Sequence, residues 1–232
     1  PEIAGEAPVM SLRPIGRRGF DGGAAVIARH AAALGARPVL VTPLPRDPVA
    51  EALRLRLELE GVEVRSIDVS GRVPEKQRFL VGHQKVMKLD PERGIVVDEA
   101  ARRAAVAESL AAAEDADAAI VCDFGAGFFT APMMEALTRG LADRAGVVAG
   151  DVSGRRSHLQ AMRRLDLLTP SEVEIRDARH DWNDGIPAVV DRLLQATESR
   201  AAIVTLAGEG CLLFEAETGA GDPGAADPGR PA

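Results

Sequence analysis

Residues 117–127, DAAIVCDFGAG, form an apolar run that ends in one acidic residue and a turn containing glycine. The run 118–122 predicts a strand, Asp123 follows it in the turn, and Thr130 and Pro132 mark the start of a helix. The same order of apolar strand and polar or glycine-rich turn recurs at 146–154, 165–172 and 201–210. Because helical stretches separate these strands, crossovers must connect them. The sequence therefore predicts an α/β fold, with a mainly parallel sheet and helices on both faces.

The ligand site is expected at the ends of these strands. In open parallel sheets, ligands bind beyond the carboxyl ends of the strands, where the turns gather. We therefore expect the functional site to lie along Asp123, Asp151, Thr169 and Gly210. The alternative role for either carboxylate is to stabilise its own turn.

Composition narrows the class of protein. The chain has 232 residues, 46% of them hydrophobic, which is enough for one well-buried α/β domain or a domain with a small appendage. A formal net charge of −7 disfavours a nucleic-acid partner. No apolar run has the length of a signal-peptide core or a membrane span, so we expect a soluble protein with no membrane partner.

The sequence shows no pattern of metal ligands. Cys122 and Cys211 lie in apolar strand runs without a CxxC spacing, which predicts buried free thiols in a reducing cytoplasm. None of the four histidines has a carboxylate or cysteine at useful spacing, so we expect no functional role for His30, His83, His158 or His180.

The βα pattern starts near the N-terminus and is interrupted once. Helices are predicted at 24–34, 47–61, 98–113 and 186–196, and further strands at 37–42 and 62–67. Residues 71–92 alternate apolar and charged side chains, which predicts two antiparallel strands with a turn at Gly82 and His83, forming a small β flap. Residues 215–232 hold four glycines and three prolines, so we expect a loop or a disordered tail.

Short motifs in one order along the chain carry a family resemblance. They are Glu6-Ala7-Pro8-Val9, Gly22-Gly23-Ala24-Ala25, Lys76-x-Arg78, Gln84-x-x-x-Lys88-x-Asp90-x-Glu92, Asp123-Phe124-Gly125-x-Gly127, Asp151-x-x-Gly154, Leu168-Thr169-Pro170 with Glu174, and Val204-Thr205-Leu206 followed by Gly210. Each motif alone is weakly specific. Together they resemble the ribokinase-like (PfkB) carbohydrate kinases, in particular the heptose phosphate kinase domain of ADP-heptose synthesis. Residues 1–214 would then be a partial kinase domain, with its flap at about 71–92.

The resemblance implies phosphoryl transfer from ATP, with Mg²⁺, to a hydroxyl of a phosphorylated sugar of the heptose phosphate kind. It implies sugar-side contacts at Gly22, Gly23, Arg78, Lys88 and Asp123. It implies nucleotide-side contacts, without a direct protein ligand to the metal, at Asp151, Ser171, Glu174, Thr205 and Gly210. It also implies a homodimer that pairs through the flap. The alternative role of Arg78 and Lys88 is to form a solvated charged face of the ribbon.

The sequence departs from the family pattern at several places where glycine, lysine or asparagine is expected. The departures are Val26, Pro45, Ala126, Ser153 and Ser171. Most of them remove a charge or a hydrogen bond that would serve an anionic substrate. Two alternatives to an active sugar kinase therefore stay open. One is a catalytically degenerate relative that binds sugar or nucleotide, and the other is a nucleoside kinase of the same fold.

The catalytic signature of the family has one weak match. Residues 218–222, TGAGD, spell a glycine-rich turn whose catalytic base would be Asp222. Pro223, Gly224 and further prolines prevent the helix that should follow this turn, so we interpret Asp222 as a decoy. The genuine signature is expected downstream, and the first strand of the family before Pro1. We therefore interpret the chain as a kinase truncated at both ends, which does not turn over ATP by itself.

Overall fold

The computed structural model describes residues 2–3, 10–11, 13–90, 94–154 and 157–216. The chain divides into two compact units, Pro1–Glu108 (unit 1) and Ser109–Ala232 (unit 2). The boundary falls inside helix α3, Glu99–Ala112. None of the helices among the described residues is both long and apolar enough to cross a membrane.

Unit 1 contains a small α/β sheet. Strands β3 (Val39–Pro45) and β4 (Glu63–Gly71) pair in parallel, and β7 (Ile95–Val96) joins β4 in antiparallel fashion. Helix α1 (Ala24–Ala33) and helix α2 (Pro48–Leu59) cover it, and Leu40, Leu57 and Val62 form their common core. Asp47 caps α2 as predicted, because its Oδ1 accepts the N–H of Ala50 at 2.8 Å. A short antiparallel pair, β1 (Glu2–Ile3) and β2 (Met10–Ser11), precedes these elements.

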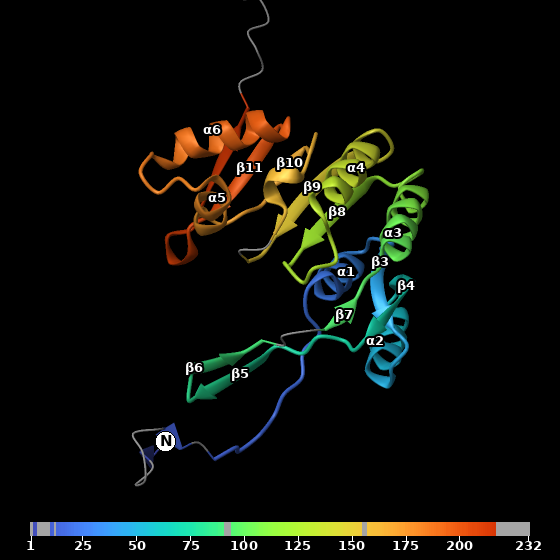
Figure 1. Ribbon diagram of the computed structural model, residues 1–232, viewed down its shortest axis with the longest axis vertical. Helices are drawn as coiled ribbons and strands as arrows, with labels where there is room; N and C mark the ends of the chain where they lie inside the picture. Colours follow the sequence, from blue (N-terminus) through green and yellow to red (C-terminus); the bar gives the residue numbers. More distant parts are fainter. Residues whose placement is uncertain (1, 4–9, 12, 91–93, 155–156, 217–232) are drawn as a thin grey trace, which may run out of the picture. The chain divides into compact units, whose positions relative to one another are not determined.

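The predicted flap is present as a separate hairpin of unit 1. Strand β5 (Gln77–Val81) pairs in antiparallel fashion with β6 (Gln84–Leu89), and Gly82 turns between them with φ of +60° (Figure 1). The register places Phe79 opposite Met87 and Arg78 opposite Lys88. Since neighbouring residues of a strand point to opposite faces, Phe79 and Met87 lie on one face of the ribbon, here called the apolar face, and Arg78 and Lys88 lie on the other, here called the cationic face. A register shift follows between Phe79 and Leu80, where Leu80 pairs with Lys85.

Unit 2 holds a five-stranded sheet in the order β12-β11-β10-β9-β8. The strands are β8 (Ala118–Asp123), β9 (Val147–Val152), β10 (Leu167–Leu168), β11 (Ala201–Thr205) and β12 (Cys211–Glu215). The four strands β8 to β11 run parallel, which confirms the predicted parallel pairing of these strands. Strand β12 runs antiparallel to β11, because only the short turn with η2 (Ala207–Glu209) joins them and so short a connection makes a hairpin.

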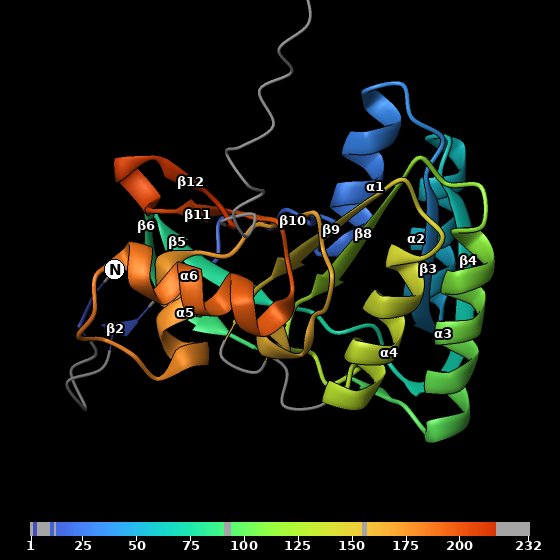
Figure 2. The same cartoon turned by 90° about the horizontal axis from the view of Figure 1, so that it is seen from above.

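Helices line one face of this sheet. They are α4 (Ala131–Ala142), α5 (Glu172–Arg179) and α6 (Ile186–Thr197), and Figure 2 shows them along one side of the strands. Val121, Val148 and Val204 point toward them and are buried, whereas Ile120 and Val147 alternate with these residues and are about half exposed. The core of unit 2 therefore lies between this face and the helices.

The connection from β9 to β10 is a compact loop with one turn of 3₁₀ helix, η1 (Leu159–Ala161). Leu159, Met162 and Leu165 of this loop are all buried. They press so closely on β9 that a Cβ atom at Gly150 would lie 2.7 Å from the sulfur of Met162 and 2.5 Å from Leu165. Only glycine fits at position 150, and the loop is seated directly on the sheet.

One expectation about a single residue was wrong, and one helix was not predicted. Cys211 is exposed, because it lies on the edge strand β12 rather than inside the sheet. Cys122 is a free thiol as expected, and burial raises its pKa to about 12. Helix α5 was not predicted, because its eight residues, EVEIRDAR, are mostly charged.

Candidate functional site

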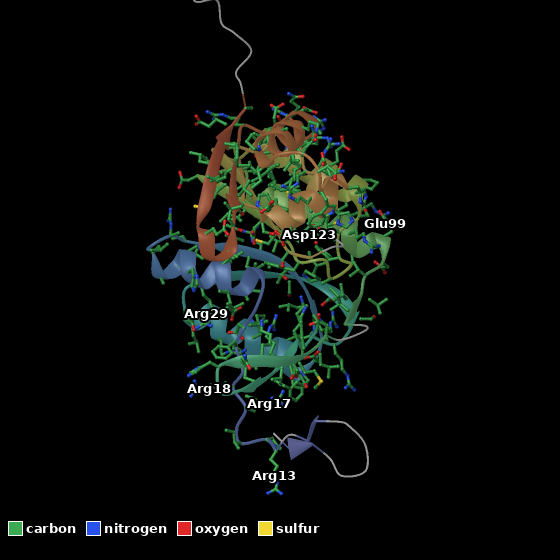
Figure 3. The ribbon with its side chains drawn as sticks, turned by 90° about the vertical axis from the view of Figure 1, so that its left-hand side faces the viewer. Arg13, Arg17, Arg18, Arg29, Glu99 and Asp123 are labelled. Carbon is green, nitrogen blue, oxygen red and sulfur yellow. The ribbon has the colours of Figure 1, made fainter. Side chains whose placement is uncertain are left out.

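Strands β8, β9, β10 and β11 end at one edge of unit 2, here called the carboxyl edge. Asp123 is the last residue of β8 and is labelled in Figure 3. Its side chain is buried, with 3% of the residue exposed. Its Oδ1 accepts the N–H of Gly125 at 3.0 Å, and its carbonyl oxygen accepts the N–H of Ser153 at 2.8 Å. Asp123 therefore ties the turn after β8 to the end of β9.

His158 is the partner of Asp123, which corrects the expectation that this histidine has no carboxylate partner. Its main-chain N–H donates to Oδ2 of Asp123 at 2.7 Å, and its Nδ1 lies 2.8 Å from the same oxygen. The sequence carries no signal for this pair, because 35 positions separate the two residues and only the fold of the β9–β10 loop brings them together.

Asp151 lies on the strand next to that of Asp123. It is the register partner of Cys122, the residue before Asp123, so its side chain points to the opposite face of the sheet from that of Asp123. The hydroxyl of Thr169 donates to its Oδ1 at 3.1 Å. Burial raises the pKa of the Asp151 carboxyl, the Thr169 hydrogen bond opposes that rise, and the negative charge of Glu174 adds to it. Asp151, Thr169 and Glu174 therefore form one electrostatic group at the carboxyl edge.

Ser171 and Glu174 build the start of α5 as a capping box. The Ser171 hydroxyl accepts the N–H of Glu174 at 3.3 Å, and Oε2 of Glu174 accepts the N–H of Ser171 at 2.8 Å. Oε1 of Glu174 also accepts the N–H of Gly154 at 3.3 Å, which connects α5 to the loop after β9. The spacing S-x-x-E is the signal from which this helix could have been predicted.

Thr205 and Gly210 complete the carboxyl edge at β11. Thr205 ends this strand, forms a parallel bridge with Ser171, and donates its N–H to the carbonyl of Pro170 at 3.0 Å. Gly210 follows η2 with φ of +97°, a conformation that favours glycine, and its carbonyl accepts the N–H of Leu206 at 2.8 Å. The structure thus brings together the unit 2 residues singled out by sequence: Asp123, Asp151, Thr169, Ser171, Glu174, Thr205 and Gly210.

The other predicted site residues belong to unit 1 or lie outside the described residues. Gly22 and Gly23 precede α1, and Gly23 is its N-cap with φ of +59°. Arg78 and Lys88 face each other across the flap, and Nζ of Lys88 lies 2.6 Å from Asp90. This contact, followed by the charges of Lys76 and Arg78, lowers the pKa of Asp90. Asp222 lies outside the described residues.

The carboxyl edge offers carboxylates and hydroxyls, but the described residues contain no group of three or more His, Cys, Asp or Glu side chains arranged to hold a metal ion. The charge of Glu174 is close enough to Asp151 to raise the pKa of the Asp151 carboxyl. Magnesium keeps several waters and is commonly held by one or two carboxylates together with phosphate oxygens. These two carboxylates fit that mode of binding.

Several solved structures share the fold of this chain. The tetrameric inhibited form of phosphofructokinase-2 from Escherichia coli aligns with a TM-score of 0.72 and 17% identity, covering 89% of this chain and 71% of that one. Ribokinase from Giardia lamblia aligns with a TM-score of 0.66 and 12% identity, covering 88% and 71%. The fold and the carboxyl edge therefore define an α/β protein of the ribokinase-like class.

The chain belongs to the pfkB family of carbohydrate kinases, because the model of that family matches residues 16–226. Among curated relatives, the bifunctional protein HldE of Halorhodospira halophila is 33% identical over 222 residues, which cover 93% of this chain and 44% of the relative. The HldE protein of Hyphomonas neptunium is 28% identical over 213 residues, covering 90% and 43%. The D-beta-D-heptose 7-phosphate kinase of Bordetella bronchiseptica is 29% identical, covering 91% and 67%. The chain thus spans less than half the length of the bifunctional relatives.

Proposed function

We propose that the protein is an ATP-dependent sugar kinase that transfers the γ-phosphoryl group to a hydroxyl of a phosphorylated sugar of the heptose 7-phosphate kind. Family membership supports the reaction class, and the name of the Bordetella bronchiseptica relative supports the substrate class. The observation that carries the proposal is the carboxyl edge of unit 2. There, four strands that are distant in sequence and adjacent in space end at or close to Asp123, Asp151, Thr169, Ser171 and Thr205.

The proposed roles follow the position of each residue. The cationic face of the flap, with Arg78 opposite Lys88, suits the phosphate of the sugar, and Gly22 with Gly23 allows a close approach of backbone to ligand. In unit 2, Thr205 and Gly210 would border the nucleotide. Asp151 and Glu174 would hold Mg²⁺ through water beside the phosphates of ATP. Bound magnesium would neutralise charge on the phosphates during transfer.

A catalytically degenerate binding protein is the second candidate. The observation that favours it is the capping box, in which Glu174 already accepts hydrogen bonds from Ser171 and Gly154. A carboxylate engaged in this way has less capacity for a hydrated metal ion. Such a protein would bind sugar phosphate or nucleotide without transferring phosphate.

The experiment measures binding and turnover separately, with protein purified at the full length of its reading frame. Isothermal titration with ATP and Mg²⁺ and with D-β-D-heptose 7-phosphate measures binding, and release of ADP measures turnover. Turnover with the heptose phosphate supports the kinase. Binding without turnover supports the degenerate protein. Titration with nucleosides is added as a third arm, and binding of nucleosides alone would instead indicate a nucleoside kinase. Binding of none of these compounds would refute the proposal.

Partner and location are part of the same proposal. The apolar face of the flap carries Met87 and Leu89, which are 48% and 53% exposed, so a homodimer paired through this face would cover them. Both cysteines are free thiols, which fits the reducing cytoplasm where ATP is available.

A further inference from the structure

The Asp123 carboxylate is occupied by the protein itself. It accepts three hydrogen bonds, one from Gly125 on Oδ1 and two from His158 on Oδ2, and 3% of the residue is exposed. A carboxylate offers about four acceptor positions, so little of its capacity is left for a ligand. Asp123 is thus better placed to hold His158 than to touch a substrate.

The contact with Asp123 determines which nitrogen of the His158 ring carries hydrogen. An ionised carboxylate only accepts hydrogen bonds, so Nδ1 at 2.8 Å from Oδ2 must be the donor. In the neutral ring the other nitrogen, Nε2, then presents a lone pair. The pair therefore fixes both the orientation of the imidazole and its hydrogen-bonding character.

Nε2 is available to a ligand. It forms no hydrogen bond with any residue in the ranges that the structure describes, and the His158 side chain is 25% exposed. His158 is the N-cap of η1, in the loop that follows β9 beyond the carboxyl edge. An acceptor at this place suits a hydroxyl group, because a hydroxyl can donate to it directly.

The loop that carries His158 is fixed independently of the ring. Leu159 and Met162 are 1% and 0% exposed, and Met162 packs against Gly150 of β9. The main-chain N–H of His158 holds Asp123 whatever the side chain is. A change of the ring alone should therefore leave the loop in place.

We propose that His158 binds a hydroxyl group of the ligand through Nε2, and that Asp123 is the positioning residue that holds the ring in the required tautomer. The inference rests on the proposed function, and it moves the hydroxyl contact from Asp123 to His158. The hydroxyl belongs either to the sugar phosphate or to the ribose of the nucleotide, and the experiment distinguishes the two.

The key variant is His158→Asn. The asparagine amide nitrogen can take the place of Nδ1 and keep the hydrogen bond to Asp123, but nothing replaces Nε2. Its matched control is His158→Gln, which places an amide near Nε2 and loses the Nδ1 donor. Both variants and the wild type are titrated with ATP, 2′-deoxy-ATP, 3′-deoxy-ATP, D-β-D-heptose 7-phosphate and analogues of that sugar lacking one hydroxyl.

We expect the wild type to bind one deoxy analogue about tenfold more weakly than the ligand that keeps all its hydroxyls, because the analogue cannot donate to Nε2. His158→Asn should bind these two ligands with equal affinity, because the variant has already lost the same hydrogen bond. The analogue that shows this coupling identifies the hydroxyl as sugar or ribose. His158→Gln should recover part of the difference. Unchanged thermal unfolding of His158→Asn would show that the loop has kept its structure.

A measurement without ligand tests the role of Asp123. Two-bond ¹H–¹⁵N correlations of the His158 ring should show hydrogen on Nδ1 in the wild type and a shift toward the Nε2–H form in Asp123→Asn. Hydrogen on Nε2 in the wild type would overturn the inference, as would equal losses for every deoxy analogue in wild type and His158→Asn. If the wild type binds the parent ligands normally in that case, the proposed function stands. If the wild type binds none of these ligands, both the proposed function and this inference fail.

Discussion

Asp151 is a carboxyl group that unit 2 holds in an unfavourable environment. Burial, followed by the charge of Glu174, raises its pKa above the usual 3.8. In the pH range between 3.8 and the raised value, the folded protein binds more protons than the unfolded chain, so its stability falls as pH rises. A carboxyl group with a raised pKa is typical of functional sites.

Asp151→Asn should remove this dependence on pH. We expect the variant and the wild type to unfold alike below the usual pKa of 3.8, and the variant to become the more stable of the two as the pH rises from there. Urea unfolding at a series of pH values measures the difference. Glu174→Gln is the control, because without the Glu174 charge the free energy of unfolding should fall less as the pH rises than it does in the wild type. A constant difference between Asp151→Asn and wild type would show that Asp151 has an ordinary pKa.

Ser171 should contribute to stability through its hydroxyl. Ser171→Ala removes one half of the capping box, and we expect a loss of about 1 kcal/mol in the free energy of unfolding. Ser171→Thr retains the hydroxyl and serves as the control. Equal stability of Ser171→Ala and wild type in urea unfolding would mean that α5 does not depend on this cap.

At the scale of elements, the flap has two faces with different expected roles. Met87 lies on the apolar face, and the adjacent Lys88 lies on the cationic face opposite Arg78. We expect Met87→Glu to convert a dimer into a monomer, because it places a charge in the proposed apolar interface. Light scattering coupled to gel filtration measures the mass.

Lys88→Ser is the matched control on the neighbouring position. It should leave the dimer intact and weaken the binding of a sugar phosphate, because it removes one cation from the face proposed to bind phosphate. A wild-type protein that is monomeric at all concentrations would contradict the proposed dimer.

The elements that sequence predicted are those with strong local signals. The apolar runs of β8, β9 and β11, each followed by a polar or glycine-rich turn, were sufficient to place Asp123 and Asp151 at the ends of parallel strands. Helix α5 was not predicted from the sequence, because its eight mostly charged residues show no apolar periodicity, although its S-x-x-E cap was visible. The pairing of Asp123 with His158 had no local signal, since it depends on how the β9–β10 loop folds back over the sheet.

At the scale of the whole molecule, the chain forms two units, and its single tryptophan reports on one of them. Trp182 lies between α5 and α6 in unit 2. Asp47 lies in unit 1, where it caps α2 and also accepts the N–H of Val73 at the base of the flap, at 3.1 Å. Units of this size commonly unfold as separate cooperative bodies.

Asp47→Ala should therefore lower the unfolding midpoint measured by circular dichroism and leave the Trp182 fluorescence transition unchanged. The matched variant Ser171→Ala, in unit 2, should shift the Trp182 fluorescence transition. A shift of the fluorescence transition in Asp47→Ala would show that the two units unfold as one.

The close packing of Met162 and Leu165 over Gly150 has a consequence for how such a protein can diversify. The buried apolar side chains of the β9–β10 loop fix its position on the sheet, whereas the main chain at position 158 holds Asp123 whatever side chain stands there. A lineage could exchange the imidazole for another group, and thereby change which compound it prefers, without rebuilding the platform beneath it.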